Sequence, residues 1–191
     1  MYQLIKQILK TGIKTEDPPQ PNEAMRVDTQ RLQQEILHIL GSALSIRHVD
    51  AGSCNGCELE IQSASNAYYN IEGLGIKFVA SPRHADMLLV TGPVSRHMEV
   101  ALKRTYEATP EPKLVVAIGD CACDGGIFSP EDGGESYASC GKVSNVIPVD
   151  VVVSGCPPAP AAIMQGILTA ISSKKSISLR LGNAPHQNNR L

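Results

Sequence analysis

The sequence contains no tryptophan, and only 4% of its residues are aromatic. Proteins that bind single-stranded nucleic acid stack bases on aromatic side chains, and most nucleic-acid-binding domains are strongly basic. This chain instead has a net charge of −2 at pH 7. Its composition therefore argues against a nucleic-acid partner.

Long apolar runs are missing as well. No stretch approaches the roughly 20 apolar residues of a transmembrane helix, and no secretory signal pattern is present at the N-terminus. Six cysteines in 191 residues are too few for a disulfide scaffold. Because 42% of the residues are hydrophobic, we expect a packed globular core. The cysteines then point to metal or redox chemistry in a reducing compartment.

The strongest chemical signal is the stretch C-N-G-C-E-L-E at residues 54–60. It lies between an apolar run over 44–51, which predicts a strand, and a helical pattern over 58–70. Two single cysteines, Cys121 and Cys156, also follow apolar runs. A pair and two single cysteines on strand-to-helix turns can converge at one edge of a parallel sheet. This arrangement predicts a metal site with four thiolate ligands.

Apolar runs and helical patterns alternate from residue 44 onward. The expected strands cover residues 45–49, 76–80, 85–90, 113–118 and 149–153, and the expected helices cover 58–70, 95–108 and 158–172. The alternation predicts an α/β fold with a flavodoxin-like, doubly wound parallel sheet in the strand order 2-1-3-4-5. Ligands bind beyond the carboxyl ends of such strands, where residues 91–94 should line the same crevice as the cysteines. Residues 121–148, rich in glycine and acidic residues, are expected to form a long irregular loop.

An extension precedes this fold. It comprises an amphipathic helix over residues 1–13 with a basic polar face, a proline-rich linker over 15–22 and a second amphipathic helix over 30–40. The first helix is expected to lie on a membrane surface or against an apolar wall of a partner. The expected domain organisation is an N-terminal helical extension (1–43), an α/β domain (44–173) and a C-terminal tail (174–191).

Thiolate ligands favour zinc, copper(I) or an iron–sulfur cluster. Structural zinc sites usually take two close pairs of ligands, whereas this chain has one, Cys54 and Cys57. Cys156 precedes a proline, as some iron–sulfur ligands do. The spacing favours a [4Fe–4S] cluster over zinc, while buried structural thiols and a thioredoxin-like dithiol remain alternatives. A cluster needs four cysteines, so two of the six, Cys123 and Cys140, are surplus, and we rank both as non-ligands.

Two carboxylates, Glu58 and Glu60, directly follow the cysteine pair. A carboxylate at this place stabilises a helix N-terminus or relays protons beside a redox centre. Residues two positions apart do not share a helix face, so only one of them should point to the site. The same choice between a structural role and proton relay applies to Asp120, Asp124 and His48.

The motifs together resemble those of one family. G-S-C-N-G-C-E-L-E at 52–60, G-D-C at 119–121 and G-C-P-P at 155–158 resemble the small subunit of [NiFe] hydrogenases and the homologous complex I subunit that holds the terminal iron–sulfur cluster. The resemblance covers about residues 44–173 and implies one [4Fe–4S] cluster. The implied ligands are Cys54, Cys57, Cys121 and Cys156. Glu60 stands where both branches often carry a glutamate near the cluster, which makes it a candidate proton relay.

Two departures from the family pattern indicate the branch. Complex I subunits typically have adjacent cysteines at the first motif, whereas this chain has C-N-G-C, as hydrogenases do. Uptake hydrogenases add a C-terminal domain with further clusters, whereas residues 174–191 contain no cysteine and only His186 as histidine. The chain thus resembles the small subunits of membrane-bound group 4 hydrogenases, such as formate hydrogenlyase and hydrogenase-4.

This resemblance implies an electron-transfer subunit of a multisubunit oxidoreductase. The subunit would take electrons from a ferredoxin-like iron–sulfur subunit and pass them to the Ni–Fe centre of a large subunit, where protons become H2. It would sit with membrane-arm subunits, peripheral to the cytoplasmic face of the inner membrane. Two alternatives are a complex I-like subunit that passes electrons to quinone and a zinc-stabilised structural subunit.

Overall fold

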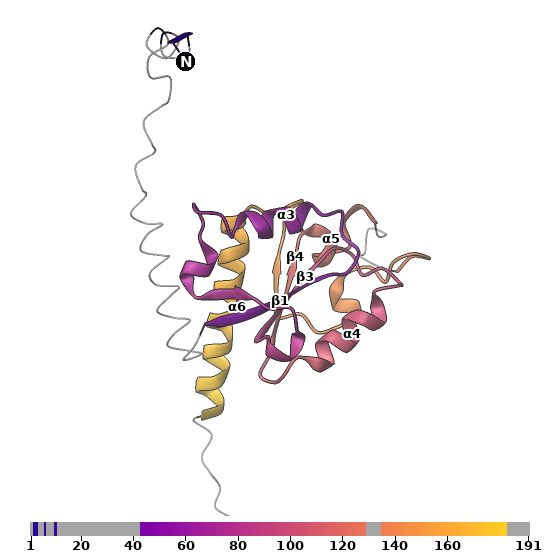
Figure 1. The fold of residues 1–191 in the computed structure, drawn as a ribbon. Helices are drawn as coiled ribbons and strands as arrows, with labels where there is room; N and C mark the ends of the chain where they lie inside the picture. Colours follow the sequence, from indigo (N-terminus) through magenta and orange to yellow (C-terminus); the bar gives the residue numbers. More distant parts are fainter. Residues whose placement is uncertain (1, 4–5, 7–9, 11–42, 129–134, 183–191) are drawn as a thin grey trace, which may run out of the picture.

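The computed structural model describes residues 2–3, 6, 10, 43–128 and 135–182, with only the backbone of 174–182. Its centre is a parallel sheet in the order β2-β1-β3-β4-β5 (Figure 1). The strands are β1 (Leu44–Asp50), β2 (Ile76–Phe78), β3 (Met87–Thr91), β4 (Leu114–Ile118) and β5 (Val151–Val153). The predicted α/β fold and its strand order are confirmed.

Helices cover both faces of the sheet. They are α3 (Gly56–Ser63), α4 (Glu99–Ala108), α5 (Asp120–Cys123) and α6 (Pro160–Gly182), with short 3-10 turns η1 (Ile71–Leu74), η2 (Pro82–His84), η3 (Gly126–Phe128) and η4 (Val143–Asn145). The cores on the two sides follow the alternation of the strands: α3 and α6 pack on the face that carries Ile46 and Leu89, and α4 packs on the face that carries Leu88 and Val90. Because both of their faces are covered, β3 and β4 are buried along their whole length.

Two predicted helices have different ends in the structure. The helix expected over 58–70 ends at Ser63, because the Asn66 side chain accepts the backbone N–H groups of Tyr68 and Tyr69 and so forms a local turn. The helix expected over 158–172 continues to Gly182, into the segment expected to be a tail. No glycine or proline occurs between residues 173 and 181 to end it earlier.

The prediction of an irregular loop over 121–148 is partly wrong. The described part of this segment contains most of α5, together with η3 and η4. Its return path pairs with the segment after β3, since Cys140 N–H donates to the Val94 carbonyl at 2.7 Å and Val94 N–H to the Gly141 carbonyl at 2.9 Å. These contacts join residues that are distant in sequence, so no local sequence pattern predicts them.

The N-terminal predictions fall largely outside the described residues. Residues 2, 3, 6 and 10 are helical, in keeping with the helix predicted over 1–13. The linker over 15–22 and the helix over 30–40 lie outside that description. None of the helices in the described part of the chain combines the length and the apolar character that a membrane span requires.

Candidate functional site

The candidate site lies at the carboxyl edge of the sheet. Cys54 lies in the turn between β1 and α3, and Cys57 in the first turn of α3. Cys121 lies in α5, directly after β4, and Cys156 follows β5. Parallel strands all end at the same edge, so these turns are neighbours even though they are far apart in sequence.

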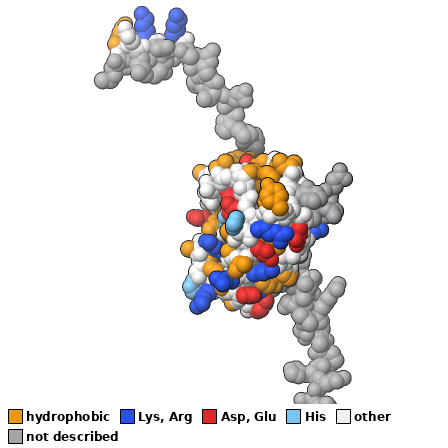
Figure 2. Space-filling view, turned by 90° about the vertical axis from the view of Figure 1, so that its right-hand side faces the viewer, with side chains coloured by type: hydrophobic (Ala, Val, Ile, Leu, Met, Phe, Trp, Pro, Cys, Tyr) orange, Lys and Arg blue, Asp and Glu red, His pale blue; other side chains and the backbone are white. Residues whose placement is uncertain are grey.

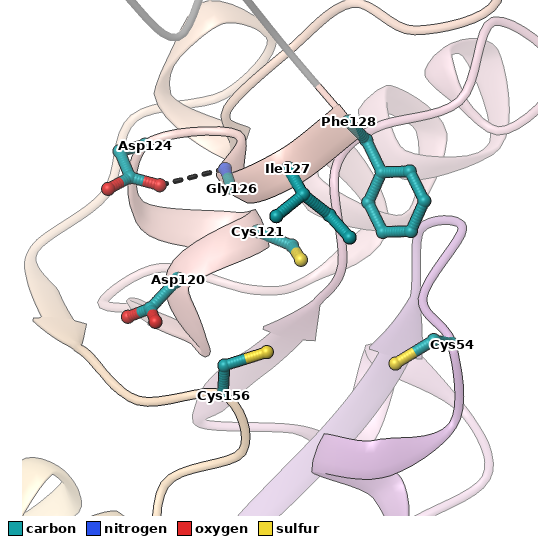
Figure 3. Close-up of a pocket in the computed structure, with 8 residues that line it drawn as sticks. All are labelled: Cys54, Asp120, Cys121, Asp124, Gly126, Ile127, Phe128 and Cys156. Atoms are coloured by element: carbon teal, nitrogen blue, oxygen red, sulfur yellow. Dashed lines mark hydrogen bonds between the residues drawn. The ribbon is translucent and has the colours of Figure 1, made fainter. Parts of the chain in front are cut away.

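Three of the cysteines line one hollow of about 400 Å³ (Figure 3). Cys54 and Cys156 turn their sulfur atoms towards each other across this space, and the sulfur of Cys121 points into it (Figure 3). The remaining lining residues are Asp120, Asp124, Gly126, Ile127 and Phe128. The hollow thus brings together thiols from the first, fourth and fifth strand ends. The segment 91–94, expected to line the same crevice, instead lies behind the first cysteine turn, with Gly92 against the backbone of Ser53.

Cys57 packs against the turn between β4 and α5. A Cβ atom on Gly119 would lie 2.5 Å from Cys57 Sγ. Gly119 has φ 88° and ψ 153°, a backbone conformation that is essentially restricted to glycine. Glycine at this position therefore lets the Cys57 thiol approach the segment that carries Cys121.

The four thiols influence one another electrostatically. Burial raises the pKa of Cys57 to about 12, with repulsion from the thiolates of Cys121, Cys54 and Cys156 among the further causes. Burial also raises the pKa of Cys121, followed by repulsion from Cys156 and Cys54. The protein alone thus disfavours the thiolate forms of Cys57 and Cys121, and a bound cationic metal group would offset the repulsion.

The arrangement of the donor side chains bears on which metal group they could hold. Among the described residues, no group of three or more His, Cys, Asp or Glu side chains is arranged to hold one metal ion. A [4Fe–4S] cluster makes a different demand, because each of its four cysteines binds a separate iron of a larger body. Three thiols around a hollow, with the fourth packed beside it, are compatible with this demand, and a cluster at these cysteines stays a prediction.

Behind the cysteine pair, three polar side chains form a cluster: Glu58, Thr91 and His48. The sequence alone did not predict that these three side chains meet. Glu58 is only 7% exposed and accepts a hydrogen bond from the hydroxyl of Thr91, at the end of β3. His48 Nε2 lies 3.1 Å from Thr91 Oγ1 and 3.7 Å from Glu58 Oε1. The second oxygen of Glu58 is buried without a hydrogen-bond partner. The sequence marks Glu58 and His48 as two separate candidate site residues, but only the pairing of β1 with β3 in the structure brings Thr91 between them.

The other acidic candidates have different surroundings. Glu60 is partly exposed on α3 and does not line the hollow, and its role as a proton relay stays a prediction. Asp120 and Asp124 line the hollow, and both accept backbone hydrogen bonds. Asp120 Oδ1 accepts the N–H of Gly155 at 2.6 Å, and Asp124 Oδ1 accepts the N–H of Gly126 at 2.8 Å.

The two surplus cysteines lie away from the hollow. Cys140 is buried, with its thiol 3.5 Å from Glu99 Oε2 on the α4 side of the sheet. Cys123 donates a weak hydrogen bond to the Ala117 carbonyl at 3.8 Å, and burial raises its pKa to about 11. Neither residue lines the hollow, and their ranking as non-ligands stays a prediction.

Comparison with known proteins gives a consistent result. The family described as NADH ubiquinone oxidoreductase, 20 kDa subunit, matches residues 54–170. A probable membrane-bound hydrogenase subunit of Pyrococcus furiosus is 44% identical over 75% of this chain and 85% of its own length. Formate hydrogenlyase subunit 7 of Escherichia coli is 39% identical over 73% of this chain and 53% of its own length. An NADH-quinone oxidoreductase subunit of Desulfovibrio desulfuricans is 43% identical over 59% of this chain and 58% of its own length.

A solved structure agrees with these relatives. A chain of the membrane-bound sulfane sulfur reductase, an archaeal respiratory membrane complex, is 32% identical and matches with a TM-score of 0.61 over 76% of each chain. The relatives are subunits of oxidoreductases, which confirms the prediction of a subunit of a multisubunit oxidoreductase. The chain belongs to the family of the NADH ubiquinone oxidoreductase 20 kDa subunit, in which its relatives include hydrogenase subunits.

Proposed function

We propose that this chain is the electron-transfer subunit of a membrane-bound, H2-evolving hydrogenase complex, and that it relays electrons to a Ni–Fe centre in a partner large subunit. Cys54, Cys57, Cys121 and Cys156 would hold a [4Fe–4S] cluster. When bound, such a cluster supplies one-electron transfer at a potential that its surroundings set. The observation that carries the proposal is the gathering of these four cysteines at one edge of the sheet.

The surface next to the hollow supports a partner at this edge. Ile127 is 89% exposed and Phe128 49% exposed, and both line the hollow. In the view of Figure 2, apolar side chains gather along the upper rim of the described domain, and acidic and basic side chains are intermixed below. A large subunit packed over Ile127 and Phe128 would bury this apolar surface and keep water from the thiols.

The other partners follow from the same proposal. A ferredoxin-like iron–sulfur subunit would deliver electrons, and membrane-arm subunits would hold the complex at the cytoplasmic face of the inner membrane. The relatives named as a membrane-bound hydrogenase subunit and as a formate hydrogenlyase subunit support this assembly. The helix predicted over residues 1–13 would contribute its apolar face to the membrane side.

Metal analysis and EPR of the intact, dithionite-reduced complex test the proposal. We expect about four iron atoms to depend on this chain, with nickel in the large subunit. Cys156→Ser should remove that iron and its EPR signal, whereas Cys140→Ser should leave both unchanged. Zinc at these cysteines without a cluster signal would contradict the electron relay.

A second candidate is a complex I-like subunit that passes electrons to quinone or to another acceptor without nickel. The 43% identity to an NADH-quinone oxidoreductase subunit and the match to the sulfane sulfur reductase chain favour it. The C-N-G-C spacing favours the hydrogenase. A cluster that depends on Cys156 in a complex free of nickel would move the assignment to this second candidate.

A further inference from the structure

Two of the cysteine turns are joined by a reciprocal pair of hydrogen bonds. The backbone N–H of Asp120 donates to the carbonyl oxygen of Gly155 at 3.0 Å. The N–H of Gly155 in turn donates to Asp120 Oδ1 at 2.6 Å. Asp120 directly precedes Cys121, and Gly155 directly precedes Cys156, so the two bonds link the residues next to both thiols. Figure 3 shows the Asp120 carboxylate beside Cys156.

We propose that Asp120 is a positioning residue, which holds the turn of Cys156 at a fixed place relative to Cys121 so that both thiols face one metal cluster. The inference rests on the proposed function, because it assumes that these cysteines bind a cluster together. It assigns to Asp120 a role that is structural and local to the site.

The need for a side chain at this place follows from the end of the β4–β5 pairing. The strand pairing stops at Ile118 and Val153, and one more backbone bond joins Gly119 N–H to the Val153 carbonyl at 2.8 Å. Gly155 then has φ 138°, which takes the chain out of strand geometry. The Asp120 carboxylate continues the connection between the two segments past the last pair. The bond that this carboxylate accepts from the Gly155 N–H is short, at 2.6 Å, against about 2.7–3.2 Å for most N–H···O hydrogen bonds.

The charge of Asp120 offers no benefit to the thiolates. The carboxylate repels the Cys121 thiolate, as it repels that of Cys123. A residue that served only the ionisation of the ligands would therefore be neutral or basic. The benefit of Asp120 lies in its oxygen acceptor, which a neutral amide also provides.

This distinction defines the experiment. Asp120→Asn keeps an oxygen that can accept the Gly155 N–H and removes the charge, whereas Asp120→Ala removes both. Each variant is introduced into the intact complex, and the EPR signal that depends on Cys156 is followed during incubation with a ferrous-iron chelator. Losing the hydrogen bond that joins the two turns should make the signal of Asp120→Ala decay about fivefold faster and change its line shape. Asp120→Asn should keep the wild-type decay rate and line shape.

Asp150→Ala is the matched control. Asp150 Oδ2 accepts the N–H of Val115 at 2.7 Å, and its own N–H donates to the Val115 carbonyl at 2.9 Å, so it joins β4 to the segment before β5 by the same kind of pair, away from the residues that line the hollow. Its variant should therefore decay at the wild-type rate.

Three results would overturn the proposal: a wild-type line shape and decay rate in Asp120→Ala, an Asp120→Asn signal lost as fast as that of Asp120→Ala, or equally fast loss in Asp150→Ala. If the alanine variant fails to assemble, an Asp120→Asn signal that decays faster than the wild-type signal would overturn the proposal instead. If the wild-type complex has no signal that depends on Cys156, the proposed function itself is wrong, and the failure is distinguishable from these three.

Discussion

The four proposed ligand cysteines differ in their access to solvent, and burial makes the Cys57 thiol harder to ionise. Cys54 and Cys156 are exposed, whereas Cys57 is partly buried and its pKa is raised by burial to about 12. The thiolate is the form that reacts with alkylating agents. In the metal-free chain at mildly alkaline pH, iodoacetamide should therefore modify Cys54 and Cys156 first and Cys57 much later, at a rate that increases with pH.

Peptide mass spectrometry of a time course measures this order. The metal-loaded protein is the control, because bound metal should protect all four ligand thiols while leaving the surplus cysteines as they were. Alkylation of Cys57 as fast as that of Cys54 would show that its thiol is not buried as described.

His48 gives the stability of the domain a dependence on pH. Burial lowers the pKa of His48 below its ordinary value of 6.5, despite the attraction of Glu58. Between the lowered pKa and 6.5 the unfolded chain binds more protons than the folded one, so stability increases with pH over this interval. The contribution of His48 is fully present above pH 6.5 and is lost as the pH falls.

The variant His48→Gln tests this dependence, since glutamine can hydrogen-bond but does not titrate. Urea unfolding across the acidic range should show a shallower loss of stability for the variant than for the wild type. His84→Gln is the control, because His84 is exposed on η2 and its replacement should leave the slope unchanged. Equal slopes for wild type and His48→Gln would contradict the prediction.

Between elements, the contact of α3 with the β4–α5 turn depends on Gly119. Replacing Gly119 by alanine would place a methyl group against Cys57 Sγ and force a side chain into a backbone conformation that costs about 1–3 kcal/mol. We expect Gly119→Ala to lower the melting temperature and to lose the iron that depends on Cys57.

Gly75→Ala separates these two effects. Gly75 has a similarly positive φ of 84°, but a Cβ atom there would meet nothing within 4 Å. This variant should lose some stability through backbone strain and keep its iron. If both variants kept full iron content, the close approach of Cys57 to Gly119 would not matter to the site.

The elements also show which parts of the structure are predictable. The strands were recognisable because β3 and β4 are continuous apolar runs, and their order placed the four cysteines at one edge. The end of α3 is not predictable from the sequence pattern, because it depends on a turn around Asn66 that competes with the helix. The hydrogen bond between Asp120 and Gly155 is equally unpredictable from the sequence, since 35 positions separate the two residues and no periodic pattern connects them.

For the domain as a whole, sheet position should determine local stability. β3 is flanked by β1 and β4 and is buried throughout, whereas β2 and β5 are short strands at the two edges. Backbone amides that open only by global unfolding exchange slowest with solvent deuterium. We expect the slowest hydrogen exchange in β3 and β4 and the fastest among the strands in β2 and β5.

Hydrogen-exchange mass spectrometry of the purified protein measures this gradient. If the backbone amides of β5 exchanged as slowly as those of β3, this would indicate that a partner or a bound group stabilises that edge of the sheet. In the proposed function, removing the cluster should reduce protection most in the peptides that contain Cys121 and Cys156, because the regular strand pairing ends before them, at Ile118 and Val153.

The separation of the cysteines along the chain has a consequence for how the protein is made. Cys54 follows the first strand of the sheet and Cys156 the last. On the ribosome, three of the four proposed ligands therefore emerge before the strand that presents the fourth has been synthesised. In the proposed function, iron–sulfur delivery has to wait until β5 has joined the sheet. A nascent chain released before Cys156 would lack the fourth proposed ligand and would therefore retain no cluster.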